Sequence, residues 1–251
     1  MRHPGRSGSI PRAAGAATLL AAVLLAGCAT GLSAERIDAI VASPERSAAD
    51  RGNDVRRKPA QMLGFIDIRP GIVALDVSAG RGYTTELVAR AVGPGGKVYS
   101  QTQGPTPPAL AQRARNPATS NIVPVVRPMQ DPVPPEAAGN ALDLVTLMFN
   151  YHDLGHMGVD RGHMNHAIFE ALKRGGSYVI ADHAGRAGTG ISESGTLHRV
   201  EEAFVIAEVT AAGFRLAASG NFLRNPADPR DRETPEPPMP KDEFVLKFVK
   251  P

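Results

Sequence analysis

The stretch LDVSAGRGYTTELVA, residues 75–89, joins an apolar run to a helical pattern through a turn of small residues. Residues 71–77 are short, apolar and rich in branched side chains, which predicts a buried strand. Residues 83–92 have the apolar spacing of a helix. Between them, Gly80 and Gly82 let the backbone approach a ligand, and the helix N-terminus offers free N–H groups. The stretch therefore predicts a strand–turn–helix unit that binds a ligand at its turn.

The spacing of the glycines argues against a dinucleotide cofactor. The dinucleotide fingerprint is G-x-G-x-x-G, and after Gly80 and Gly82 its third glycine position is Thr85. A glycine-rich turn alone also serves close packing of strand and helix. The turn thus indicates a ligand site without naming the ligand.

Strand and helix patterns alternate along the rest of the chain. Further strands are predicted within 93–101 and at 121–126, 141–149 and 176–182, with helices at 33–43, 54–67, 164–176 and 200–214. Two last strands, 214–223 and 243–250, have only a Pro/Asp-rich loop between them, which favours an antiparallel pair. The fold expected is α/β: a Rossmann-like, seven-stranded, mostly parallel sheet with an antiparallel edge hairpin and helices on both faces.

The N-terminus has the pattern of an export signal. Arg2, Arg6 and Arg12 precede an uncharged run, 13–26, that is too short for a relaxed membrane span. The run ends at Leu-Ala-Gly-Cys, which resembles the lipobox of bacterial lipoproteins and implies lipidation of Cys28. A plain signal peptide or an uncleaved anchor is the alternative.

These patterns divide the chain into a lipoprotein signal peptide at 1–27, an N-terminal linker and helix at 28–54, and the α/β domain at 55–251. The lipobox resemblance implies a protein held by its lipid on the periplasmic face of the bacterial cell envelope. Ala29 stands where an aspartate usually retains lipoproteins in the inner membrane, so we expect the outer membrane.

Charge and cysteine content exclude several classes of partner. The predicted leader holds three arginines and no acid, so 25 of the 28 basic residues remain against 25 acidic ones. A mature chain of zero net charge with few aromatic residues gives no reason to expect a nucleic-acid partner. Cys28 is the single cysteine, which excludes intramolecular disulfides and thiolate metal sites.

The element order and three motifs resemble the class I S-adenosylmethionine (SAM)-dependent methyltransferases. ALDVSAGRGY (74–83) is similar to their cofactor motif Asp/Glu-x-Gly-x-Gly-x-Gly, with Ser78 at the first glycine. LDLVTLMFNYHDL (142–154) resembles their fourth strand and its exit, and ALKRGGSYVIAD (171–182) resembles the next helix, turn and strand. The likeness covers about residues 55–250. It extends to bacterial predicted methyltransferases that carry secretion signals and a Tyr-His-Asp after strand four.

The resemblance implies SAM as cofactor, with eight candidate contacts: Asp76, Ser78, Gly80, Gly82, Tyr83, Gln101, Asp131 and Asn150. Besides Ser78, two positions depart from the family. Where the family has an acid that grips the ribose, strand two ends in Gln101, Thr102 and Gln103, and a neutral hydrogen bond there gives up about 1 kcal/mol. Asp131 is the candidate for the acid near the adenine, and it lies some residues late in the sequence.

Four of the histidines fall in YHDLGHMGVDRGHMNH, residues 151–166. His152 and His156 are four residues apart and His163 and His166 three, a helical spacing that could hold a divalent metal with Asp153. Glycines 155, 158 and 162 interrupt that helix, so we expect no metal site. A metal-binding surface stays open as a minor alternative.

His152 and His183 are placed differently, because each directly follows a strand at the carboxyl edge of the sheet. His198 and Arg199, which open the following helix, are expected to converge on the same cleft. A histidine accepts a proton near neutral pH, so His152, Tyr151 and His183 are the candidate catalytic residues, with Asn150 beside them. Each histidine can equally be structural. The glycine- and serine-rich segment 184–195 is the expected lid.

The function that follows from the resemblance is methyl transfer from SAM to a small molecule or other acceptor that the sequence does not identify. SAM is made in the cytoplasm, however, and an exported lipoprotein is separated from it. The alternative is therefore a degenerate methyltransferase fold that acts as a non-catalytic ligand-binding or interaction lipoprotein.

Overall fold

The computed structural model describes residues 1, 3, 5 and 31–251. Most of the expected signal peptide, and Cys28 with it, lie outside the described residues. Among the described helices, none combines the length and the apolar composition needed to cross a membrane.

One seven-stranded sheet forms the centre of the molecule, in the order β3-β2-β1-β4-β5-β7-β6. Its strands are β1 Val73–Val77, β2 Lys97–Thr102, β3 Ile122–Val126, β4 Leu142–Met148, β5 Leu172–His183, β6 Arg215–Gly220 and β7 Glu243–Val249. β1 to β5 pair in parallel, whereas β7 pairs antiparallel with both β5 and β6. The expected fold class, including the antiparallel edge pair, is confirmed.

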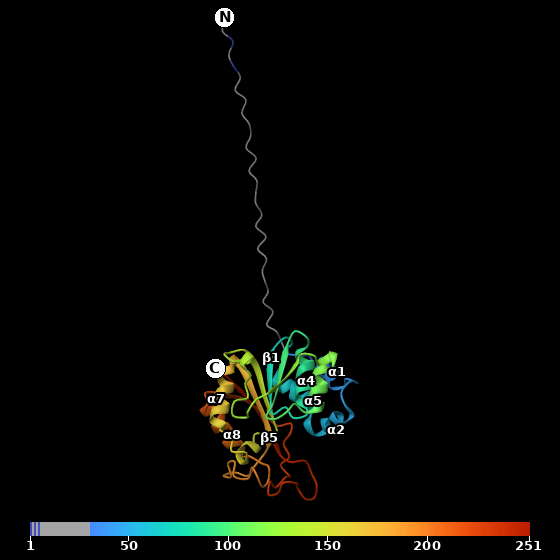
Figure 1. Ribbon diagram of the computed structural model, residues 1–251, viewed down its shortest axis with the longest axis vertical. Helices are drawn as coiled ribbons and strands as arrows, with labels where there is room; N and C mark the ends of the chain where they lie inside the picture. The colour runs from blue at the N-terminus through green and yellow to red at the C-terminus, as the bar shows by residue number, and fades with distance from the viewer. Residues whose placement is uncertain (2, 4, 6–30) are drawn as a thin grey trace.

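Helices cover both faces of this sheet (Figure 1). On one face lie α7 Arg161–Ala171 and α8 Glu202–Ala211, whose Ile168 and Val209 belong to a core with Leu75. On the other lie α1 Ala34–Val41, α3 Pro59–Ile66, α4 Tyr83–Val92 and α5 Pro108–Arg115, which pack on a second core around Ala74. Adjacent residues of β1 thus point to opposite cores, as the pleat of a strand requires.

The N-terminal helices pack on that second core. α1, which precedes the domain boundary expected at residue 55, contributes Ile37 and Ile40 to this core. α2 Ala48–Arg57 follows, and Pro59 begins α3, the position at which a missing N–H costs least. The remaining helical pieces are the short η1 Pro117–Thr119, η2 Pro135–Ala137 and α6 Asp153–His156.

The helix expected at 54–67 is divided between α2 and α3, and the boundary between α7 and β5 also differs from its prediction. The helix expected to reach residue 176 ends at Ala171, and β5 begins at Leu172. Leu172 is fully buried and pairs with Leu142 of β4, and Gly175 has a φ of 76° that interrupts helical geometry. Sheet pairing therefore recruits residues whose local pattern looked helical.

Candidate ligand-binding cleft and histidine cluster

An open cleft of about 220 Å³ lies at the carboxyl ends of β1, β2 and β4. The chain runs outward from β1 to β2 and β3 and then returns to place β4 on the other side of β1. Such a reversal of strand order is where open α/β sheets bind ligands. The cleft is lined by Ser78, Gly80, Thr102, Gln103, Gly104, Pro105, Pro107, Met129, Asn150, Asp153, Leu154 and Met157.

The glycine-rich turn after β1 forms one wall of this cleft. Gly80 has a φ of 54°, and a Cβ built on it would meet no atom closer than 3.9 Å. The N–H groups of Gly80 and Arg81 donate no hydrogen bond to any described residue. The turn therefore presents open space to the cleft and carries two N–H donors without a partner among the described residues, as expected of a ligand-binding turn.

Ser78 shares this wall in a strained conformation. Its φ is 56°, in the left-handed region that costs a residue with a Cβ roughly 1 kcal/mol or more. The backbone N–H of Ser78 donates to Oε1 of Gln101 at 2.8 Å, and the N–H of Ala79 donates to the carbonyl of Gln101 at 2.9 Å. Two hydrogen bonds from one residue of β2 thus hold the turn in place.

Gln101, expected to contact the ribose of the cofactor, instead uses its side chain for hydrogen bonds within the protein. It is fully buried, and its Nε2 donates to the carbonyl of Arg127 at 2.7 Å. Its side chain points away from the cleft because successive residues of a strand face opposite ways. Thr102 lines the cleft in its place, with Oγ1 donating to the carbonyl of Gly104 at 2.9 Å.

Asp76 is likewise buried beneath the turn. Its carboxylate accepts hydrogen bonds from the hydroxyls of Thr85 in α4, at 2.6 Å, and Thr146 in β4, at 2.7 Å. Burial raises the pKa of Asp76 to about 6, despite these two hydrogen bonds. The residue ties α4 and β4 to β1 and does not line the cleft.

Gly82 and Tyr83 face helices. A Cβ on Gly82 would lie 2.9 Å from side-chain atoms of both Leu110 and Arg113, so glycine permits the close approach of α5. The hydroxyl of Tyr83 donates to Asp54 of α2 at 2.6 Å. Neither residue lines the cleft. Tyr83, expected to contact the cofactor, instead anchors the N-terminal helices.

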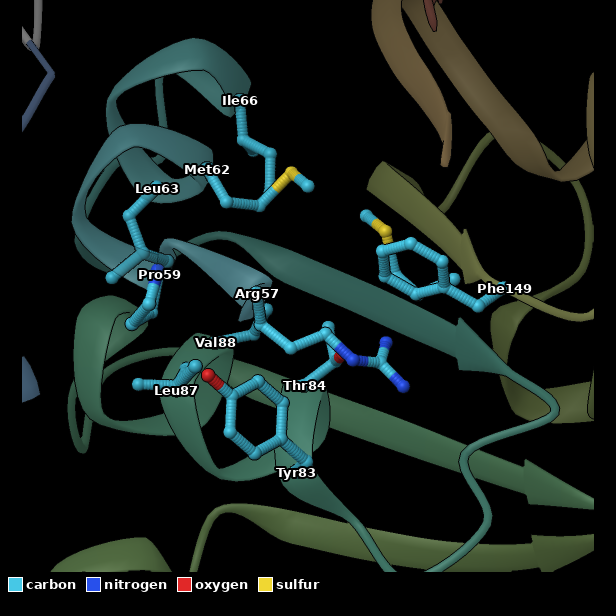
Figure 2. A pocket seen from close by; sticks show the side chains of 11 residues that line it. Arg57, Pro59, Met62, Leu63, Ile66, Tyr83, Thr84, Leu87, Val88 and Phe149 are labelled. Atoms are coloured by element: carbon cyan, nitrogen blue, oxygen red, sulfur yellow. The ribbon is translucent and has the colours of Figure 1, made fainter. Parts of the chain in front are cut away.

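Tyr83 belongs to a separate apolar pocket between α3 and α4 (Figure 2). Arg57 reaches between Tyr83 and Phe149, with its guanidinium carbon 3.9 Å from the Phe149 ring centroid. Burial, with the neighbouring charge of Arg56, lowers the pKa of Arg57 to about 10. The pocket encloses only about 20 Å³, room for roughly one water, and so takes no cofactor.

Asp131, expected near an adenine, lies outside the cleft. It pairs with Arg127 and borders a surface hollow next to α7. Met129, two residues earlier, lines the cleft and supplies an apolar surface there.

Tyr151, a candidate catalytic residue, is fully buried in the core. Its hydroxyl donates to Glu208 of α8 at 2.9 Å and accepts from Asn165 of α7 at 3.0 Å. Burial and the charge of Glu208 raise the pKa of Tyr151. Its side chain therefore fastens the β4 exit to these helices and does not reach the cleft.

His152 is held by an aspartate at the end of β5. Nδ1 of His152 lies 2.6 Å from Oδ1 of Asp182, and the backbone N–H of His152 donates to Oδ2 of Asp182 at 2.7 Å. Burial opposes a charge on His152, but the hydrogen bond and charge of Asp182 outweigh it and raise the pKa of His152. This pair leaves Nε2 of the imidazole to face outward from the core.

Asp153 links that histidine to the cleft. Its Oδ1 lies 3.0 Å from Nε2 of His152 and 3.1 Å from Nδ1 of His198, while its Oδ2 accepts from Asn150 at 2.9 Å. Asn150 and Asp153 both line the cleft. We call His152, Asp153, Asp182 and His198 the histidine cluster.

His183 and His156 stand around this cluster. The His183 ring lies 5.4 Å from that of His152, and its Nδ1 is 3.1 Å from Glu243 Oε1. Burial lowers the pKa of His183. Nδ1 of His156 lies 3.0 Å from the hydroxyl of Ser194, in the segment expected to be a lid, so hydrogen bonds tie that segment to α6.

Two further sets of candidate residues, the histidines of α7 and Arg199, lie away from the sites expected for them. His163 and His166 are exposed on α7 and lie outside the cluster. Arg199, expected in the cleft, is fully buried: it pairs with Asp228 at 2.9 Å and donates to the carbonyl of Ala184 at 3.0 Å. It fastens the loop before β7 to the end of β5.

The sequence analysis did not identify Asp182, and it considered Asp153 only as a ligand of the alternative metal site. The available signal for Asp182 was its position: this aspartate directly precedes His183 at the carboxyl end of strand five. An acid and a histidine at the ends of two neighbouring parallel strands meet at one edge of the sheet.

Comparisons with known proteins agree with this fold. No protein-family model matches the chain. Over 55 residues it is 46% identical to the protein-L-isoaspartate O-methyltransferase of Aeropyrum pernix, a match that spans 22% of this chain and only 20% of that relative.

Solved structures are similar over most of the chain. A SAM dependent methyltransferase from Aquifex aeolicus superposes with a TM-score of 0.61 at 16% identity, covering 88% of this chain and 100% of that one. The cyclase SpnF superposes with a TM-score of 0.57 at 18% identity, covering 81% of each chain. A shared fold does not fix the reaction, as the cyclase illustrates. The chain has the Rossmann-like methyltransferase fold, with a cleft at its β1–β4 switch point.

Proposed function

We propose that the chain is a SAM-dependent methyltransferase that binds its cofactor in the cleft at the ends of β1, β2 and β4. The observation that carries the proposal is the wall formed at Gly80. It combines a left-handed glycine, open space where a Cβ would project, and two N–H groups that find no partner in the part of the chain that the structure describes. Such a wall accepts a carboxylate through backbone donors, and SAM has a carboxylate at its amino-acid end.

The other cleft residues fit the rest of the cofactor. The Thr102 hydroxyl and the Gln103 amide are polar groups at the end of β2, where the family resemblance places the ribose. Met129 and Leu154 offer apolar surface to a purine. When bound, SAM supplies an electrophilic sulfonium methyl group. No carboxylate faces the ribose position, so we expect weaker binding than an acid would give.

The chain's own contribution to the reaction is to align the acceptor. Asn150 and Asp153 form the cleft wall nearest the histidine cluster, and Asp182 fixes the orientation of His152 behind them. Holding acceptor and methyl group in line, away from water, provides most of the rate in such a transfer. The cluster offers nitrogen and carboxylate groups that can take the acceptor's proton.

Calorimetric titration of the purified chain with SAM and with S-adenosylhomocysteine tests this proposal. Binding of both ligands in the micromolar range, abolished by Gly80→Val, supports it. Absence of affinity below the millimolar range would refute it and would favour the non-catalytic alternative.

We further propose that the chain is exported and anchored by a lipid on Cys28, like the secreted bacterial predicted methyltransferases that its motifs resemble. The leader sequence and the Leu-Ala-Gly-Cys motif support this. The periplasmic face of the outer membrane is the proposed location. The methyl acceptor would then be a molecule of the envelope, and SAM would have to reach that compartment.

A further inference from the structure

The histidine cluster brings together groups that bind metals. Nε2 of His152, a carboxylate oxygen of Asp153 and Nδ1 of His198 all lie within 4.8 Å of one another. The two distances to Oδ1 of Asp153 are 3.0 Å and 3.1 Å. Neighbouring ligands bound at about 2.0–2.2 Å in octahedral or tetrahedral sites lie roughly 3.0–3.5 Å apart. Each imidazole nitrogen is therefore already spaced from the Asp153 carboxylate as two ligands of one metal ion would be.

The hydrogen bond between His152 and Asp182 fixes the direction in which Nε2 of His152 points. Asp182 is fully buried and accepts from the backbone N–H groups of His152 and His183, both at 2.7 Å, so its position is fixed. With its proton on Nδ1, toward Asp182, the neutral His152 imidazole turns the lone pair of Nε2 toward Oδ1 of Asp153. Two lone pairs 3.0 Å apart repel each other, so a positive charge belongs between them. Either a second proton or a metal ion can supply it.

Supporting contacts around the three groups favour the metal ion. A carboxylate behind a histidine ligand fixes its tautomer and raises its basicity, and such outer contacts are typical of metal sites. Asn150 holds the second oxygen of Asp153 at 2.9 Å. His198 has a φ of 50°, an uncommon backbone conformation that directs its imidazole into the cluster.

We propose that His152, Asp153 and His198 bind one divalent first-row transition-metal ion at the edge of the cleft. Two imidazole nitrogens and one carboxylate suit Zn²⁺, Co²⁺ and Fe²⁺ better than Mg²⁺ or Ca²⁺. The side chains of Asp153 and His198 are 23% and 38% exposed, and Asp153 also lines the cleft, so solvent can reach the remaining coordination positions. With the ion bound, the lone pairs of these three groups would no longer take the acceptor's proton, and the ion would instead supply a Lewis acid next to the acceptor. That role rests on the proposed function, whereas metal binding itself does not.

Metal binding is measured on the full chain, purified without a polyhistidine tag and stripped with a chelator. Co²⁺ is titrated while visible absorption is recorded, and Zn²⁺ by calorimetry, both without SAM. We expect one equivalent to bind with micromolar or tighter affinity. Asp182→Asn should weaken binding about 10–100-fold, because it removes the partner that orients His152. His198→Asn should weaken it at least about tenfold, and asparagine tolerates the left-handed backbone.

His163→Asn is the matched control, since it removes an exposed histidine of α7 outside the cluster, and its affinity should equal that of the wild type. Circular dichroism verifies that each variant is folded. The proposal is overturned if the wild type binds neither ion below the millimolar range, or if His163→Asn lowers affinity as much as His198→Asn. A chain that binds Co²⁺ but not SAM would retain the metal site and lose the proposed function.

Discussion

Gln101 allows a sharp test of how the glycine-rich turn is held. Its Oε1 accepts from the N–H of Ser78 at 2.8 Å, and its Nε2 donates to the carbonyl of Arg127 at 2.7 Å. Gln101→Glu keeps the size of the side chain but replaces the donor with a second oxygen. Ionised, the new carboxylate would face the Arg127 carbonyl without a hydrogen bond; protonated, it could donate as the amide does.

The expected cost follows from forcing that carboxyl group to stay protonated in the folded state. Its unfolded pKa is about 4.3, and a folded pKa above 7 costs about 1.4 kcal/mol per pH unit, or roughly 3–4 kcal/mol at pH 7. The folded pKa is the higher one, so stability relative to the wild type should fall as pH rises and recover below about pH 4.5. Leaving the Arg127 carbonyl unpaired instead would cost about 1–3 kcal/mol plus the burial of the charge.

Urea unfolding followed by circular dichroism at pH 4.5, 5.5, 6.5 and 7.5 measures this slope. Thr102→Asp is the matched control, because it adds one carboxylate at the next residue, which lines the cleft. The control should lose about 1 kcal/mol, from the bond to Gly104, with little dependence on pH. It should also bind SAM about fivefold more tightly, since a carboxylate can accept from both ribose hydroxyls. A Gln101→Glu stability that tracks the wild type at every pH would refute the assigned hydrogen bonds.

Three other predictions follow from the turn and the leader. Gly80→Val should abolish SAM binding in calorimetry, whereas Gly71→Val, with a φ of 80° in open space, should cost similar backbone strain and leave affinity intact; equal affinity of the two variants would make the turn structural. The pKa of Asp76 is raised to about 6 by burial, so ionisation should remove about 3 kcal/mol of stability between roughly pH 4 and 6, and Asp76→Asn should flatten that fall in urea unfolding. Cys28→Ser should abolish labelling by a fatty-acid analogue, and unchanged labelling would exclude lipidation at this residue.

Much of the fold could be predicted because its signals are local. The helix 83–92 follows from apolar spacing, and the antiparallel pairing of β6 with β7 follows from the absence of a helix between them. The start of β5 could not be placed correctly, because Leu172 joins the strand only through pairing with Leu142, thirty positions away in the sequence. Long-range pairing overrides local pattern where the two compete.

The site was harder to predict for a reason that the strand pleat explains. Gln101 and Thr102 are adjacent, so one faces the core and the other the cleft, and the sequence alone does not say which. The contact of His152 with Asp182 depends on the parallel register of β4 with β5, in which Met148 lies opposite Ala181. A single sequence shows the two residues but not that register.

Asp153 belongs to both the cleft and the histidine cluster, so ligands at the two places should affect each other. Its carboxylate would attract the positive sulfonium of SAM, whereas S-adenosylhomocysteine is a neutral thioether at the same position. A divalent ion between Asp153, His152 and His198 would reverse the sign of the local charge from −1 to roughly +1. Zn²⁺ loading should therefore weaken SAM binding more than S-adenosylhomocysteine binding, and SAM should weaken Zn²⁺ binding by the same factor. Calorimetric titration of each ligand with and without Zn²⁺ measures both ratios. Equal effects on the two ligands would mean that Asp153 does not couple the sites.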